Sequence, residues 1–287
     1  MPREPIFWNT PYSAVEAALE DARRDLRRYW AGHLAMLPEP GAGQTITSSR
    51  VFDAAEDRVC HDLVHARLES FDLPIVAEDI PCPEGTSGPA FLVDPLDGTH
   101  NALMGYPAFT SSVALCDADG DAVFGWVYDF SRDVTYLTVS GKGSYLQSPL
   151  TVRRLATVPR TSVEQLAVSV MRQRVKNPAL ERLMPIARKV RMSGCSSFDL
   201  CLIATGALDA FIDNNFPGHE RSCDIAAAAL VLREAGGILL NPDGTDRKIA
   251  RPGPEALRDY AGLVAVGDAR CVPSLISSLG REPEDVA

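Results

Sequence analysis

The sequence lacks any long apolar run, which excludes a helical membrane protein. No stretch approaches the roughly 18 consecutive apolar residues that a membrane-spanning helix requires. The first ten residues carry Arg3, Glu4 and two prolines where a secretory signal would have an apolar segment. Internal repeats and low-complexity tracts are missing too, so a solenoid is unsupported. These absences predict a cytoplasmic protein without a membrane partner.

Paired cysteines and an excess of positive charge are also missing. The seven cysteines are an odd number and include no CxxC pair, which predicts reduced thiols and no zinc site. The chain has 28 Lys and Arg residues against 38 Asp and Glu residues, a net charge of −10. Because a nucleic-acid binder needs a basic face, this balance disfavours nucleic acid as a partner.

What the sequence does contain is enough apolar material for a sizeable core, since 46% of its 287 residues are hydrophobic. Apolar residues at helical spacing predict helices at 13–29 and 51–70. Short apolar or alternating runs predict five strands, at residues 75–77, 90–93, 110–116, 123–128 and 134–139. The last three of these read as an antiparallel meander.

Beyond Pro149, strand-like and helical patterns alternate as far as residue 266. We therefore expect a layered α/β fold in which helix and sheet layers alternate. An N-terminal α+β half, residues 1–150, would carry most of the functional acids, and a C-terminal α/β half would follow at residues 151–287. The active site would lie between the halves.

The hexapeptide DPLDGT, residues 94–99, follows a buried apolar strand. Its two carboxylates, Asp94 and Asp97, can converge at the end of that strand, with the carbonyl of Leu96 between them. Mg²⁺ prefers such oxygen ligands and completes its octahedron with water and substrate phosphate oxygens. An Asp-rich surface turn is the alternative interpretation.

Two further acidic segments favour the metal interpretation. Glu78 and Asp79 follow the apolar strand upstream of the hexapeptide, and Asp224 opens a very apolar helix. Asp224 could equally be a simple helix N-cap, and both roles can hold together.

These motifs arrive in a fixed order along the chain. The pattern is an acidic pair, then DPxDGTxN, then a helix that begins with Trp-Asp-x-Ala-Ala and ends in EAGG. It is matched here by residues 78–79, 94–101, 223–227 and 234–237, except that Cys223 takes the place of the Trp. Further matches lie at 141–143, 191–194 and 200–213. The series resembles the inositol monophosphatase family of Mg²⁺-dependent phosphomonoesterases over about residues 13 to 270.

The resemblance implies the fold, the reaction and the metal site. It implies two or three Mg²⁺ ions held by Glu78, Asp94, the Leu96 carbonyl, Asp97 and Asp224. In such a site the cations polarise the phosphate and activate a water that attacks in line. Thr99, with Asp53 at the family's upstream Asp position, would orient that water, although Asp53 could be only an exposed first-turn carboxylate.

The resemblance also implies a small phosphorylated substrate and a homodimer. Backbone amides of Gly98 and Thr99 would hold the phosphate. Gly194, Ser196 and Asp213 fall where family members touch the hydroxylated part of the substrate, and Asp213 replaces the usual Glu. Arg221 lies in the segment between Asp213 and Asp224, which is longer than usual and is either a substrate contact or a plain connection.

Three departures leave the substrate open. Cys223 replaces the usual Trp. Asp79 replaces the second Glu of the acidic pair, and Ala77 the preceding Gly. The third departure is the longer segment between Asp213 and Asp224. An inositol phosphate is the first candidate. The alternatives are fructose 1,6-bisphosphate, histidinol phosphate, a 3′-phosphonucleotide, or a catalytically silent regulatory relative.

Overall fold

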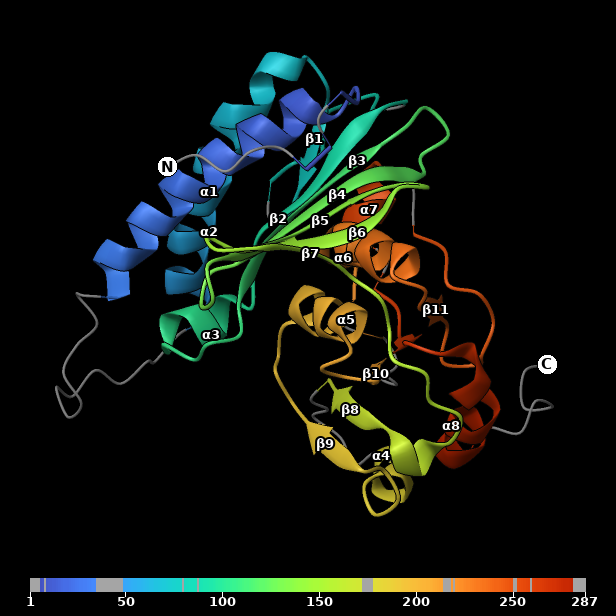
Figure 1. Cartoon of the computed structure of the whole chain (residues 1–287). Coiled ribbons are helices and arrows are strands. Elements are labelled where there is room, and N and C mark those ends of the chain that lie inside the picture. The colour runs from blue at the N-terminus through green and yellow to red at the C-terminus, as the bar shows by residue number, and fades with distance from the viewer. Residues whose placement is uncertain are drawn as a thin grey trace, which may run out of the picture.

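The computed structural model of the chain shows seven strands in one sheet, five in another, and helices on the faces of both (Figure 1). It describes residues 6–7, 9–34, 49–78, 80–86, 88–171, 178–213, 218, 220–249, 252–258 and 260–280, without the side chains of 33–34, 49–54 and 178–179. None of the helices in these ranges combines the length and the hydropathy that a membrane span requires.

The larger sheet follows the chain in order from β1 to β7. Its strands are β1 (Ile75–Ala77), β2 (Ala90–Asp97), β3 (Thr110–Cys116), β4 (Ala122–Asp129), β5 (Val134–Val139), β6 (Gly143–Gln147) and β7 (Val152–Arg154). Only β1 and β2 are parallel, and every later pair is antiparallel. Consecutive antiparallel strands need only short turns, as the Asp- and Gly-rich connections predict.

Both faces of this sheet are covered, so β5 is buried at every position and β2 and β3 are buried at all positions but one. On β2, Phe91 and Val93 pack against helices α1 (Ser13–Leu34) and α2 (Ser49–Leu68), whereas Leu92 packs against the opposite layer. Because side chains alternate along a strand, neighbouring residues of β2 serve two different cores. The two long helices are seen across the outer face in Figure 1.

The inner face is covered by α5 (Ser196–Thr205) and α6 (Ser222–Glu234), which lie between the two sheets. Helix α6 is apolar at every position from Ile225 to Leu232 and is buried from Ser222 to Leu232. A helix that is apolar all round belongs in an interior layer. The carboxylate of Glu234 accepts hydrogen bonds of 2.8 Å from the backbone amides of both Gly141 and Gly143, fixing the end of α6 to the β5–β6 turn.

The second sheet has the order β11-β12-β10-β8-β9. Its strands are β8 (Ala167–Val170), β9 (Lys189–Arg191), β10 (Ala210–Asp213), β11 (Ile238–Leu240) and β12 (Leu263–Val266). Helices α4 (Pro178–Leu183) and α8 (Val272–Leu279) cover its outer face, and Leu183 and Leu275 belong to that core. The short helices α3 (Thr99–Leu103) and α7 (Pro254–Arg258) complete the fold, together with the 3-10 turns Glu69–Phe71, Val163–Gln165 and Ala269–Cys271.

The layered α/β fold is confirmed, with helix and sheet layers in alternation. The predicted strands agree with β1, β3, β4 and β5, and β2 extends through Asp97. Strands β6 and β7 were not predicted, because Gly143 and Pro149 read as turn residues. The division at residue 150 stays a prediction, and β7 beyond it still pairs with the first sheet.

Replacing Gly125 by Ala should lower the stability of the fold. A Cβ at this position on β4 would lie 2.9 Å from the Thr138 methyl group and 3.0 Å from the Ala227 carbonyl oxygen on α6. Such overpacking costs about 1–3 kcal/mol of unfolding free energy, measurable by chemical denaturation. Gly32→Ala on α1 is the matched control, because no atom lies within 4 Å of its Cβ position. It should be neutral or raise stability by up to about 1 kcal/mol, and equal losses in both variants would contradict the packing argument.

Candidate active site

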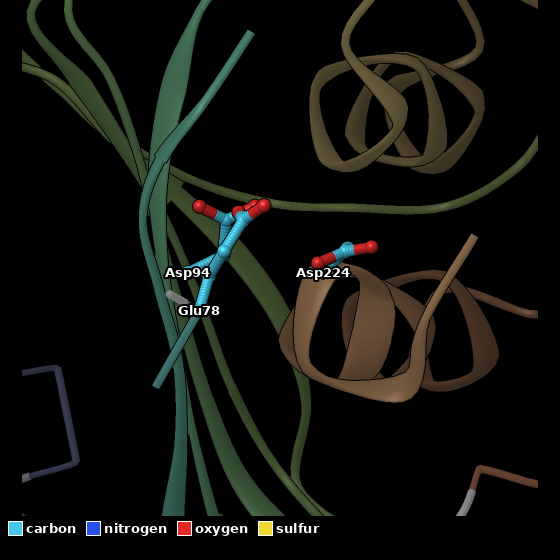
Figure 2. Close-up of side chains that lie close together, drawn as sticks. All are labelled: Glu78, Asp94 and Asp224. Carbon is cyan, nitrogen blue, oxygen red and sulfur yellow. The ribbon is translucent and has the colours of Figure 1, made fainter. Parts of the chain in front are cut away.

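Three carboxylates from three separate segments converge at the edge between the large sheet and α6. Glu78 follows β1, Asp94 lies on β2, and Asp224 lies in the first turn of α6. One oxygen of each carboxylate lies within 4.8 Å of the others. Figure 2 shows Glu78 and Asp94 extending from the strands toward Asp224 at the end of the helix. The parallel pairing of β1 and β2 brings the first two together, since Glu78 N donates to Val93 O at 3.1 Å.

The end of β2 is irregular, and this irregularity shapes the site. The register with β3 shifts between Asp94 and Asp97, where Pro95 lies in the strand. A bulge accommodates proline and changes where the following side chains point. The carboxylate of Asp94 accepts the backbone N–H of Leu96 at 3.1 Å, which closes the turn.

Gly98 completes this turn in a conformation that disfavours other residues. Its φ is +83°, and a Cβ would lie 2.8 Å from the Ala108 carbonyl oxygen. Gly98 is also the N-cap residue of α3, so the first amides of that helix lie beside the carboxylates.

Asp97 lines the same space but is held differently. Its Oδ2 accepts hydrogen bonds from both the backbone N–H, at 2.8 Å, and the hydroxyl of Ser197 on α5. Asp97 therefore links β2 to α5, and it is not one of the three mutually close carboxylates.

Thr99 is paired with an acidic residue that the sequence analysis did not select. Its hydroxyl lies 2.9 Å from Asp57 Oδ1 on α2 and 2.9 Å from the Leu96 carbonyl oxygen. Asp57, one helical turn after Asp53, is therefore the described acid that pairs with Thr99. The side chain of Asp53 lies outside the described residues, as does Asp79. Periodicity alone could not separate two acids four residues apart, because both lie on one face of a helix.

Arg221 adds a positive charge among these acids. Its guanidinium forms an ion pair with Glu78, and its Nε lies 3.0 Å from Asp224 Oδ2. The backbone N–H of Arg221 donates to the same Asp224 oxygen at 2.9 Å. Asp224 therefore is a helix-capping carboxylate as well as a member of the acidic cluster.

The predicted substrate residues lie in different relations to this cluster. Ser196, at the start of α5, lines the cavity beside the acids. Gly194 and Asp213 are not among the described lining residues. Gly194 lies next to Asn101, whose side-chain amide donates to the carbonyls of Ala108 and Ser193 and so ties this segment to α3. Asp213 ends β10 and is fully buried.

The segments that carry these residues line a cavity of about 170 Å³ that is open to solvent. Its described lining is mostly acidic or polar, namely Glu78, Asp94, Leu96, Asp97, Gly98, Thr99, Met171, Ser196, Glu220, Arg221 and Asp224. No sequence pattern predicted that Met171 would line the site. His219, in the same segment as Arg221, lies outside the described residues.

Burial and mutual repulsion raise the pKa values of the clustered acids. Burial raises the pKa of Asp94 well above its usual range, and the charges of Glu78, Asp97 and Asp224 raise it further. Burial also raises the pKa of Asp224, although Arg221 partly offsets the shift. For Asp97, burial raises the pKa while the hydrogen bonds from Ser197 lower it. The site therefore concentrates negative charge that a cation would relieve.

Residues 41–270 match the family model described as the inositol monophosphatase family. The chain belongs to the inositol monophosphatase family. Its members are phosphatases, so the protein is an enzyme that hydrolyses phosphate monoesters.

Two curated relatives illustrate the similarity of this inositol monophosphatase family member. Inositol monophosphatase 1 of Solanum lycopersicum is 31% identical over 205 residues, which cover 66% of this chain and 72% of the relative. Fructose-1,6-bisphosphatase/inositol-1-monophosphatase of Thermococcus kodakarensis is 27% identical over 244 residues, covering 84% and 89%. The crystal structure of extragenic suppressor protein suhB from Bartonella henselae superposes with a TM-score of 0.72 at 24% identity, covering 94% of this chain and 100% of that one. This last likeness shows the shared fold.

Replacing Asp57 by Asn should lower kcat by about 10- to 100-fold, the usual cost of losing a residue that orients a functional group. The reason is that Asp57 holds the Thr99 hydroxyl beside the acidic cluster. Phosphate release from inositol 1-phosphate would measure the effect, with Asp53→Asn assayed in parallel. A larger loss in Asp53→Asn than in Asp57→Asn would contradict the assignment of Asp57.

Proposed function

We propose that this enzyme is a Mg²⁺-dependent phosphatase that releases phosphate from a small polyol phosphate, with an inositol monophosphate as the first candidate. The convergence of Glu78, Asp94 and Asp224 beside the first turn of α3 carries the proposal. It combines a place for divalent cations with a place for an anion, and a phosphatase needs both within one cavity.

The donor set fits hard divalent cations. Glu78, Asp94 and Asp224 offer carboxylate oxygens, and the Leu96 carbonyl and Asp97 lie in the same lining. Described histidines and cysteine thiols are absent from the lining, so a softer metal such as zinc is disfavoured. We assign Glu78, Asp94, the Leu96 carbonyl, Asp97 and Asp224 as the residues that would hold two or three Mg²⁺ ions.

The bound cations would supply charge neutralisation on the phosphate and a lowered pKa for an attacking water. The remaining chemistry belongs to the chain itself. Because the Thr99 hydroxyl donates toward Asp57, its lone pairs are available to accept a hydrogen bond from that water and orient it. We assign the backbone amides of Gly98 and Thr99, at the start of α3, as the donors that would hold the phosphate oxygens.

The organic part of the substrate would lie toward α5 and β10. Ser196, Gly194 and Asp213 are the proposed contacts on that side, and Arg221 borders it from α6. The names of relatives support this substrate class, since one is called an inositol monophosphatase and another a fructose-1,6-bisphosphatase/inositol-1-monophosphatase. Fructose 1,6-bisphosphate, histidinol phosphate and a 3′-phosphonucleotide are therefore the comparison substrates.

The proposal also covers the setting of the enzyme. The seven cysteines are all free, as expected for a reducing compartment, and this supports a cytoplasmic enzyme. We propose a homodimer by analogy with the family.

Replacing Asp94 by Asn should lower kcat/KM for inositol 1-phosphate by at least about 100-fold, because the variant loses a charged ligand that stabilises the transition state. The measurement is Mg²⁺-dependent phosphate release by purified protein. Excess EDTA should abolish the wild-type activity, and Ca²⁺ should not replace Mg²⁺, because it prefers longer bonds and more ligands.

Asp119→Asn provides the control, since Asp119 is an exposed acid in the β3–β4 turn, away from the cavity. Its kcat/KM should remain within about two-fold of wild type. Activity that persists in EDTA, or an Asp94→Asn variant as active as Asp119→Asn, would overturn the proposed function.

A further inference from the structure

Glu220 is a buried carboxyl group in the cavity lining that the proposed mechanism does not use. Its side chain is one of the eleven described lining residues, and the residue is only 2% exposed. The Ser196 hydroxyl forms a hydrogen bond with the carboxyl group, whereas Oε1 has no hydrogen-bond partner among the residues that the structure describes. Buried polar atoms are nearly always satisfied, so an orphaned oxygen on a residue that lines a cavity calls for a partner from outside the chain.

The backbone fixes Glu220 in this position. Glu220 and Ala261 form an isolated antiparallel bridge, in which Ala261 N donates to Glu220 O at 3.0 Å. Two residues earlier, Gly218 packs so closely on Ala261 that a Cβ would lie 1.9 Å from the Ala261 carbonyl carbon. Arg221 follows as the N-cap residue of α6. The side chain of Glu220 is therefore held at the cavity wall by both of its flanks.

Glu220 does not belong to the group of carboxylates suited to the metal. The mutually close oxygens are those of Glu78, Asp94 and Asp224. Its hydrogen-bond partner Ser196 belongs to the proposed substrate side, and Asp224, Asp97 and Asp213 are near enough for their charges to act on Glu220. A substrate whose phosphate lies at the metals would extend its alcohol portion into this region.

We propose that Glu220 is a specificity-determining residue, whose Oε1 accepts a hydrogen bond from a hydroxyl or ammonium group on the alcohol part of the phosphate ester. This inference rests on the proposed function and deepens it. Among the other described lining residues outside the acidic cluster, Met171 is apolar and Arg221 is engaged by Glu78 and Asp224. An ester whose alcohol offers no donor leaves Oε1 unsatisfied, and the enzyme discriminates against it for that reason.

The test is a comparison of Glu220→Ala and Glu220→Gln with wild type on three esters in Mg²⁺. Inositol 1-phosphate offers hydroxyl donors, histidinol phosphate offers an ammonium group, and phenyl phosphate offers no donor. Glu220→Ala should lower kcat/KM by about tenfold or more for whichever donor-bearing ester the wild type prefers. It should leave phenyl phosphate within about two-fold of wild type, because that ester never uses Oε1.

The Gln variant identifies the donor and guards against misfolding, because it preserves the shape of the side chain. A hydroxyl donor can still bind the amide oxygen, so Glu220→Gln should retain much of the activity on inositol 1-phosphate. An ammonium donor needs the carboxylate, so Glu220→Gln should then lose as much as Glu220→Ala on histidinol phosphate. Either result supports the proposal.

Asp129→Asn is the matched control. Asp129 on β4 is fully buried and is not among the described lining residues of the cavity. Its Oδ2 has no hydrogen-bond partner among the described residues, although the Arg132 guanidinium lies 3.3 Å away as an ion-pair partner. Its substitution should not change the ratio of kcat/KM between the donor-bearing ester and phenyl phosphate. Equal losses on both esters in the Glu220 variants, or no loss on either, would overturn the proposed role of Glu220 and would leave the proposed function standing. A wild-type protein that hydrolyses none of the esters would overturn the proposed function itself.

Discussion

The repulsion among buried carboxylates is the constraint on which the rest of this structure depends. The carboxylates of Glu78, Asp94 and Asp224 are so close together that any two of them, when charged, repel each other by on the order of 3 kcal/mol at an effective dielectric constant of about 20. The fold holds these groups together against that cost, with a partial offset from Arg221. Such an arrangement is stable when a cation neutralises it, and this explains why a metal-dependent phosphatase concentrates its acids at one edge of a sheet.

Helix α6 is the element that imposes the arrangement. Its small side chains allow close approach to Gly125 on β4, and Glu234 anchors its last turn to the β5–β6 turn. The first turn of α6 is therefore held in a fixed position relative to β2, and Asp224 faces Asp94 as a result. The motif residues 141–143 and 234–237 thus support the active site from its far end, although none of them lines the cavity.

The sequence predicted five of the seven strands of the larger sheet, the layered fold and the acidic cluster, because each depends on local patterns. Asp94 and Asp97 lie in a motif whose spacing and turn residues are recognisable in one dimension. Asp57 was missed because its role arises from the packing of α2 on the turn at Thr99, a contact 42 residues apart in sequence. The buried position of Glu220 depends on an isolated β-bridge to Ala261, which no local sequence pattern predicts. Long-range packing is therefore what the sequence could not supply.

The most direct test of the account is the melting temperature of wild type and Asp94→Asn, measured in EDTA and in saturating Mg²⁺. The Asn side chain can still accept the hydrogen bond from the Leu96 backbone amide, so the variant removes charge with little loss of structure. We expect Asp94→Asn to melt at or above the wild-type temperature in EDTA, and Mg²⁺ to raise the melting temperature of wild type much more than that of the variant. A variant that melts clearly below wild type in EDTA, or that gains as much from Mg²⁺, would contradict the claim that these acids are held together for a cation.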